Sequence, residues 1–181
     1  MKLDCVTNSI GRRVPREIPG LGVLAPYAGA YSRLDGSYVY TPKTFPRRVP
    51  APTTDKVAPS LAAAIERPGL ESGMTVSFHH HLRNGDTVVE QVLAAAEVLG
   101  IRNLTLAPSS LGDEADCVAG FIRRGVVSRL HTSGVRGEVG KAISRGEIEA
   151  PVVIRSHGGR ARAVEEGSLR IDVAFLAAPA C

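Results

Sequence analysis

Three consecutive histidines, His79, His80 and His81, stand between a strand-like run and a helix start in residues 75–86. Imidazole can bind a metal ion, donate a hydrogen bond to an anion or carry a proton. In an extended segment neighbouring side chains point to opposite faces, so His79 and His81 would face one way and His80 the other. A zinc site needs three or four convergent ligands, and no HxxxH or HExxH spacing occurs. We therefore expect these histidines to contact an anionic ligand, with no metal bound.

Other candidate binding residues follow three further strand-like runs. Hydroxyls, imidazoles, guanidinium groups and glycines recur where each run ends. Parallel strands bring such positions to one edge of a sheet, where open α/β proteins bind ligands. Arginine matches a carboxylate with two parallel hydrogen bonds, which favours a polycarboxylate ligand. The candidate ligand-binding residues are His79, His80, His81, Arg83, Ser109, Ser110, His131, Ser133, Arg136, His157, Gly158, Gly159 and Arg160.

Several of these residues also have ordinary structural interpretations. Ser109 and Ser110 could cap the helix that follows them. Gly158 and Gly159 could form only a turn, or their backbone N–H groups could approach a phosphate or an oxyanion. The arginines could be solvated surface residues. The sequence contains no GxSxG, Walker A or GxGxxG pattern, so it identifies no nucleophile and no catalytic residue.

Short β-branched runs alternate with amphipathic helices after residue 60. This alternation predicts an α/β fold with a mainly parallel sheet covered by helices on both faces. Ser60 is expected to cap the first helix, and Asp86 or Thr87 the second. The expected strands are 74–78, 103–107, 126–130, 151–155 and 171–176, and the expected helices are 61–70, 87–100, one from Asp113 or Asp116 to 125, and 138–145.

Residues 1–59 have a different composition, rich in proline and glycine, and contain all four tyrosines. Proline removes a backbone donor, so we interpret this segment as an extended N-terminal arm. Residues 60–181 form the predicted α/β domain. The chain stops just after a strand, where a parallel sheet normally continues into another crossover. We therefore expect a partial domain, truncated at its C-terminal end, from a longer protein.

Bulk properties exclude several classes of function. The 181 residues carry a net charge of +4, with no dense Lys/Arg tract and only 4% aromatic residues, so we expect no nucleic-acid binding. The N-terminus has no apolar signal region, and no apolar run is long enough to cross a bilayer. The three cysteines are odd in number and form no CxxC, which favours a reduced, cytoplasmic setting.

Four runs give the sequence a specific family resemblance. They are "SGMTVSFHHHLRNGD", "NLTLAPSSL", residues 131–167 and the end "IDVAFLAAPAC". Together they resemble the alpha subunit of citrate lyase, a family similar to class I coenzyme A transferases. The resemblance implies a three-layer α/β/α transferase fold with two related halves and the active site between them. The residues above would belong to the first half.

The resemblance also implies a reaction and partners. The subunit would exchange the acetyl group of an acetyl-acyl-carrier-protein for citrate, giving citryl-carrier-protein and acetate. A beta subunit would then cleave the citryl thioester to oxaloacetate within an oligomeric complex. The thiol would belong to a phosphoribosyl-dephospho-CoA-type prosthetic group, a phosphopantetheine derivative, on the gamma subunit. That subunit is the acyl carrier protein, so no cofactor is expected on this chain.

Two departures limit what the resemblance implies. Class I transferases use a nucleophilic glutamate in their second half, and this chain is expected to end within the first, so no catalytic glutamate is assigned and the fragment alone is expected to be inactive. Their glycine-rich loop is replaced by residues 77–81, whose backbone and imidazoles could still donate hydrogen bonds to citrate. Two alternatives stay open. One is a non-catalytic half that binds citrate or the prosthetic group. The other is a metal-dependent hydrolase in which Cys117, His131 and His157 assist the triple histidine.

Overall fold

The computed structural model describes residues 4–23, 25, 56–79 and 87–176. The chain divides into two compact units, residues 1–42 and 43–181. In its described residues the first unit contains two short antiparallel hairpins, which the sequence did not predict. They pair β1 (Cys5–Thr7) with β2 (Arg13–Pro15) and β3 (Glu17–Ile18) with β4 (Gly22–Val23). The predicted division of the chain at residue 59 stays a prediction.

The second unit is built on a five-stranded sheet in the order β8-β7-β6-β5-β9. Every neighbouring pair in it is parallel, which confirms the predicted sheet. β6 is the central strand, β7 and β8 follow it on one side, and β5 and β9 lie on the other side. Its strands are β5 (Thr75–His79), β6 (Leu104–Leu106), β7 (Val127–Thr132), β8 (Val153–Ile154) and β9 (Val173–Leu176).

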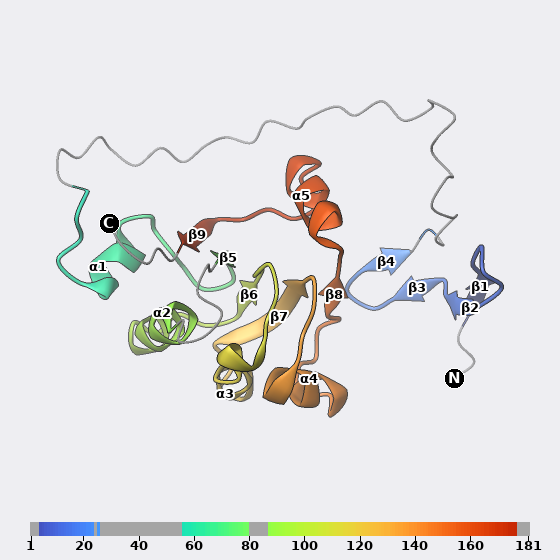
Figure 1. Cartoon of the computed structure of the whole chain (residues 1–181), viewed down its shortest axis with the longest axis horizontal. Helices are drawn as coiled ribbons and strands as arrows, with labels where there is room; N and C mark the ends of the chain where they lie inside the picture. Colours follow the sequence, from blue (N-terminus) through green and yellow to red (C-terminus); the bar gives the residue numbers. More distant parts are fainter. Residues whose placement is uncertain (1–3, 24, 26–55, 80–86, 177–181) are drawn as a thin grey trace. The chain divides into compact units, whose positions relative to one another are not determined.

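Helices cover both faces of this sheet. Figure 1 shows α2, α3 and α4 on one side of the strands and α5 on the other, and α1 packs against α2. The predicted three-layer α/β/α arrangement is therefore confirmed. The helices are α1 (Leu61–Glu66), α2 (Val88–Val98), the 3-10 turn η1 (Asp113–Ala115), α3 (Val118–Arg123), α4 (Gly137–Ser144) and α5 (His157–Glu165).

The main core is aliphatic and lies between the sheet and helices α1 to α4. Alternation along β5 explains how the core is shared, because Val76 and Phe78 point into it while Ser77 contacts α5. Phe78 stacks on Phe175 of β9, with ring centroids 5.6 Å apart. A smaller apolar cluster of Ala107, Ala163 and Leu169 lies under α5.

Helix α5 was not predicted from the sequence. It begins where a loop with a Gly158-Gly159 turn was expected, so the turn interpretation is wrong. Ser156 occupies the N-cap position, and its Oγ accepts a hydrogen bond of 3.0 Å from the Gly159 N–H. Two adjacent glycines disfavour a helix by propensity, but a good N-cap and burial of Ala163 offset that cost.

The predicted cap of α1 is confirmed and supports a stability prediction. The Ser60 Oγ accepts a hydrogen bond of 3.2 Å from the Ala63 N–H at the start of a helix that buries Ile65. We expect Ser60→Ala to lower the free energy of unfolding by about 1 kcal/mol. Ser60→Asp keeps a side-chain acceptor at the N-cap position, so its free energy of unfolding should stay close to that of the wild type. Urea denaturation of the three proteins measures this difference. Equal stability of the alanine variant and the wild type would contradict the capping role.

Candidate functional site

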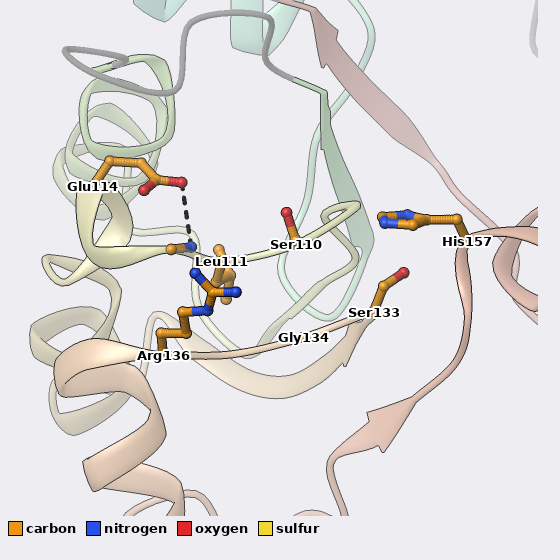
Figure 2. A pocket seen from close by; sticks show the side chains of 8 residues that line it. Ser110, Leu111, Glu114, Ser133, Gly134, Arg136 and His157 are labelled. Atoms are coloured by element: carbon orange, nitrogen blue, oxygen red, sulfur yellow. Dashed lines mark hydrogen bonds between the residues drawn. The ribbon is translucent and has the colours of Figure 1, made fainter.

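A pocket of about 330 Å³ opens at the carboxyl edge of the sheet, beside the ends of β6, β7 and β8. Its size is in the range of small-molecule sites. Three chain segments supply its walls, namely the loop after β6, the loop after β7 and the first turn of α5 (Figure 2). The lining residues are Ser110, Leu111, Gly112, Glu114, Ser133, Gly134, Arg136 and His157.

Backbone pairing between the two loops fixes the first wall. The Ser133 N–H donates to the Ser109 carbonyl at 3.1 Å, and the Leu111 N–H donates to the Gly134 carbonyl at 3.0 Å. Leu111 and Val135 then form a parallel bridge beyond the strands. The ladder of β6 and β7 thus continues into the loops, and it sets the hydroxyl-bearing residues Ser110 and Ser133 along one pocket.

The helix-cap interpretation of Ser109 and Ser110 is wrong, because Gly112 occupies the N-cap position of the following turn. The Ser109 carbonyl is used by the loop pairing, and Ser110 lines the pocket. The Ser133 Oγ is buried and has no hydrogen-bond partner among the residues that the structure describes. A buried hydroxyl in that state favours a ligand acceptor or donor at its position.

Arg136 supplies the cationic group of the pocket and His157 supplies an imidazole. Arg136 is exposed, ends the loop after β7 and occupies the N-cap position of α4. His157 is exposed at the first position of α5, and Figure 2 shows its ring on the same side of the pocket as Ser110 and Ser133. A guanidinium, an imidazole and two hydroxyls are suited to bind an anion with several carboxylates.

The two glycines after His157 lie in the first turn of α5 rather than in a phosphate-binding turn. The Gly159 N–H already donates to the Ser156 Oγ, so that donor is occupied. The N–H of Gly158 belongs to the helix start, where uncapped donors normally face solvent or a ligand. Contact of either glycine with a ligand stays a prediction.

His131 lies within β7, not after it as expected. It pairs with Val153 of β8, so its backbone belongs to the ladder. Its Nδ1 lies 3.0 Å from the Arg155 Nη1. Because arginine can only donate, Nδ1 is the acceptor and the neutral ring carries its proton on Nε2. Burial, then the charges of Arg155 and Arg129, hold the pKa of His131 below its usual 6.5.

This lowered pKa predicts a pH dependence of stability. As pH falls below 6.5, the unfolded chain binds a proton at His131 before the folded chain does, so folding loses stability down to the folded pKa. We expect the wild type to lose more stability than His131→Gln between about pH 7.5 and pH 5.5. Urea denaturation across that range measures the difference. Parallel pH profiles of the two proteins would show that His131 is not desolvated.

Arg160 is partly buried between α5 and the sheet. Its Nη2 donates to the Ser77 Oγ at 2.7 Å and to the Ala107 carbonyl at 2.9 Å. Burial lowers its pKa, and its buried Nε has no hydrogen-bond partner within the described part of the chain. Arg160 therefore ties α5 to the ends of β5 and β6, and a direct ligand contact stays a prediction.

Of the triple histidine, the structure describes only His79. His79 is exposed at the end of β5. His80, His81 and Arg83 lie outside the described residues, so their predicted contacts with ligand stay predictions. Over residues 4–23, 56–79 and 87–176, no group of three or more His, Cys, Asp or Glu side chains could hold a metal ion.

Two further findings concern the cysteines and the helices. Cys117 is a free thiol. Burial, then the charge of Glu90, raises the pKa of Cys117 above its usual value, which disfavours the reactive thiolate. None of the helices in the described ranges is long and apolar enough to pass through a bilayer.

Four pocket residues were missed from the sequence. Leu111, Gly112 and Gly134 contribute through the backbone pairing of the loops, which has no local sequence signal. Glu114 lies in η1, and its Oε1 accepts a 3.2 Å hydrogen bond from the Gly112 N–H (Figure 2). Its position two residues after a glycine in a loop that follows a strand is the signal that was available.

Comparison with known sequences places the chain in a family. The profile described as "Citrate lyase, alpha subunit (CitF)" matches residues 54–181, and the chain belongs to this family. Citrate lyase alpha chains of Haemophilus influenzae and Escherichia coli are each 51% identical over 126 residues, and that of Klebsiella pneumoniae is 50% identical. The match covers 70% of this chain and 25% of each relative, so the chain spans a quarter of their length.

A solved structure is similar over more of the chain. It is a Streptococcus mutans protein assigned as the alpha subunit of citrate lyase, in complex with citrate. The similarity has a TM-score of 0.77 at 40% identity and covers 95% of this chain and 32% of that one. The family resemblance and the fold predicted from the sequence are thereby confirmed.

Proposed function

We propose that this chain forms the citrate-binding part of a citrate lyase alpha subunit, which exchanges the acetyl group on an acyl carrier protein for citrate. Membership of the family and the citrate complex of the Streptococcus mutans relative support this proposal. The observation that carries it is the pocket at the carboxyl edge of the sheet. A small anion in this pocket can contact four side chains from different sides: Ser110, Ser133, Arg136 and His157.

The chemistry of citrate fits these groups. Citrate has three carboxylates and one hydroxyl, so it needs several donors and gains most from a guanidinium that can donate two parallel hydrogen bonds. Arg136 supplies that fork, the serine hydroxyls supply shorter donors, and the His157 ring supplies an N–H. In the proposed exchange a citrate carboxylate becomes the acyl group on the carrier thiol, and the displaced acetyl group leaves as acetate.

The covalent steps are proposed to use residues outside this chain. A glutamate in a second transferase-like half would be the nucleophile, and the thiol would belong to the prosthetic group of the gamma subunit. A beta subunit would consume the citryl thioester. The role of this chain is to bind and orient citrate. We place the complex in the cytoplasm, in keeping with the free thiol of Cys117.

Exchange with labelled citrate tests the proposal. A full-length alpha subunit containing this chain is incubated with acetylated carrier protein and radioactive citrate. We expect label on the carrier protein and release of one acetate per label. The 181-residue chain in the same assay is expected to bind citrate without transferring it, because it would lack the nucleophile. Absence of label on the carrier, with intact protein and carrier, would overturn the exchange function.

A further inference from the structure

We infer that Asp116 is the residue that positions Arg136 in the citrate pocket. The inference rests on the proposed citrate site and extends it to a residue that does not line the pocket. Asp116 lies between η1 and α3, on the segment that follows Gly112 and Glu114. Arg136 lies on the segment that leads into α4. A hydrogen bond from Glu138 to Asp116 joins these two segments.

That hydrogen bond connects the start of α4 to a residue far away in the sequence. The Glu138 N–H donates to the Asp116 Oδ1 at 2.7 Å, over a separation of 22 residues. In the described structure the Arg136 side chain, at the N-cap position, makes no capping hydrogen bond of its own. The first turn of α4 is therefore capped by a carboxylate from another element. A negative charge is favourable at that end of a helix, and the partial burial of the bond strengthens it.

Gly137 shows how closely the carboxylate is packed against this turn. Its φ of +55° lies in the left-handed region, which favours glycine. A Cβ added there would lie 2.0 Å from the Asp116 Oδ1 and 2.9 Å from its Cγ. Those distances are far below van der Waals contact, so Asp116 fills most of the space beside Gly137, with the Asp113 Oδ1 3.0 Å from the same point. The residue directly after Arg136 is thus fixed by backbone conformation and by close packing.

These contacts fix the position of the Arg136 backbone, from which its side chain extends. Its backbone is held on the N-terminal side by the Leu111–Val135 bridge and on the C-terminal side by the Asp116 hydrogen bond. The bridge is formed by backbone atoms, whereas the acceptor of the hydrogen bond is the Asp116 side chain, so only the hydrogen bond can be removed by substitution. Without it the first turn of α4 can unwind, and the guanidinium loses its preset direction toward a carboxylate.

Three variants of the full-length protein test this role. Asp116→Ala removes the acceptor, Asp116→Ser provides an oxygen that is too short to reach, and Asp116→Asn keeps an acceptor of the same length without the charge. We expect the alanine and serine variants to raise the KM for citrate about tenfold in the exchange assay. The kcat is expected to change less than twofold. Asp116→Asn should restore KM to within about threefold of wild type. Glu149→Ala, which removes an exposed carboxylate from the loop before β8, is the matched control and should leave KM unchanged.

Each outcome decides between positioning and other roles. An unchanged KM in Asp116→Ala and Asp116→Ser would overturn the inference, as would a loss in Asp116→Asn equal to that in Asp116→Ala. Failure of both short variants to fold, judged by thermal denaturation, would show that Asp116 holds the domain together rather than the pocket, and would also overturn it. A wild-type protein that is not saturated by citrate would instead contradict the proposed function.

Discussion

Arg136→Ala is expected to weaken citrate binding by about one to two orders of magnitude. Hydrogen bonds to a charged group contribute about 1.5–3 kcal/mol each, and a tenfold change in affinity corresponds to about 1.4 kcal/mol. Arg136 supplies the guanidinium of the pocket, and the pocket also contains the Glu114 carboxylate. Loss of the cation would therefore leave the carboxylates of citrate facing a negative side chain. Isothermal titration with citrate measures the change.

Two matched variants separate the role of the guanidinium from that of charge alone. Arg136→Lys keeps the charge but loses the planar fork, so its affinity should lie between those of the wild type and Arg136→Ala. Arg123→Ala removes an arginine from the end of α3, where it pairs with Glu147 at the surface, and should bind citrate as the wild type does. Equal citrate affinity of Arg136→Ala and Arg123→Ala would rule out Arg136 as a citrate ligand.

Leu93→Ala is expected to lower the free energy of unfolding by about 2–5 kcal/mol. Leu93 lies on α2, is 0% exposed and belongs to the main core beneath the sheet. Truncation removes buried apolar surface and leaves a cavity that its neighbours can fill only in part. Urea denaturation monitored by circular dichroism measures the loss.

Val98→Ala in the same helix is the control for that measurement. Val98 is 87% exposed, so its truncation should change stability by less than about 0.5 kcal/mol. The contrast between the two positions tests which face of α2 packs on the sheet. A loss for Val98→Ala as large as that for Leu93→Ala would mean that the helix is oriented differently.

The sheet was predictable because its strands carry a strong local signal. Short β-branched runs bounded by glycine or proline mark β5, β6 and β7, and the helices between them show the spacing of one buried face. Glycines end several helices as expected, and Gly100, Gly125 and Gly146 have positive φ. Together these signals determine a parallel α/β sheet.

Helix α5 was not predictable in the same way. Its first turn contains Gly158 and Gly159, and its apolar positions are few, so neither propensity nor periodicity indicates a helix. Tertiary contacts decide the structure. Ala163 packs in the cluster with Ala107 and Leu169, and Arg160 donates to the Ala107 carbonyl. The Ser156 cap was the one local signal for this helix.

The candidate site was predictable in its position but not in its details. The rule that strand ends share an edge brought Ser110, Ser133, Arg136 and His157 together, as the pocket shows. It could not show that Arg160 turns inward to Ser77, because that depends on the unpredicted helix. The bond from Asp116 to Glu138 joins residues 22 positions apart, and no periodicity reports such a contact.

A crystal structure of the protein with citrate is the most direct test of the central claim, that the loops after β6 and β7 and the start of α5 form one carboxylate site. We predict citrate in the pocket, with a carboxylate within hydrogen-bond distance of the Arg136 guanidinium and other oxygens near Ser110, Ser133 and His157. Citrate bound at a different place in the protein, with this pocket empty, would contradict the account.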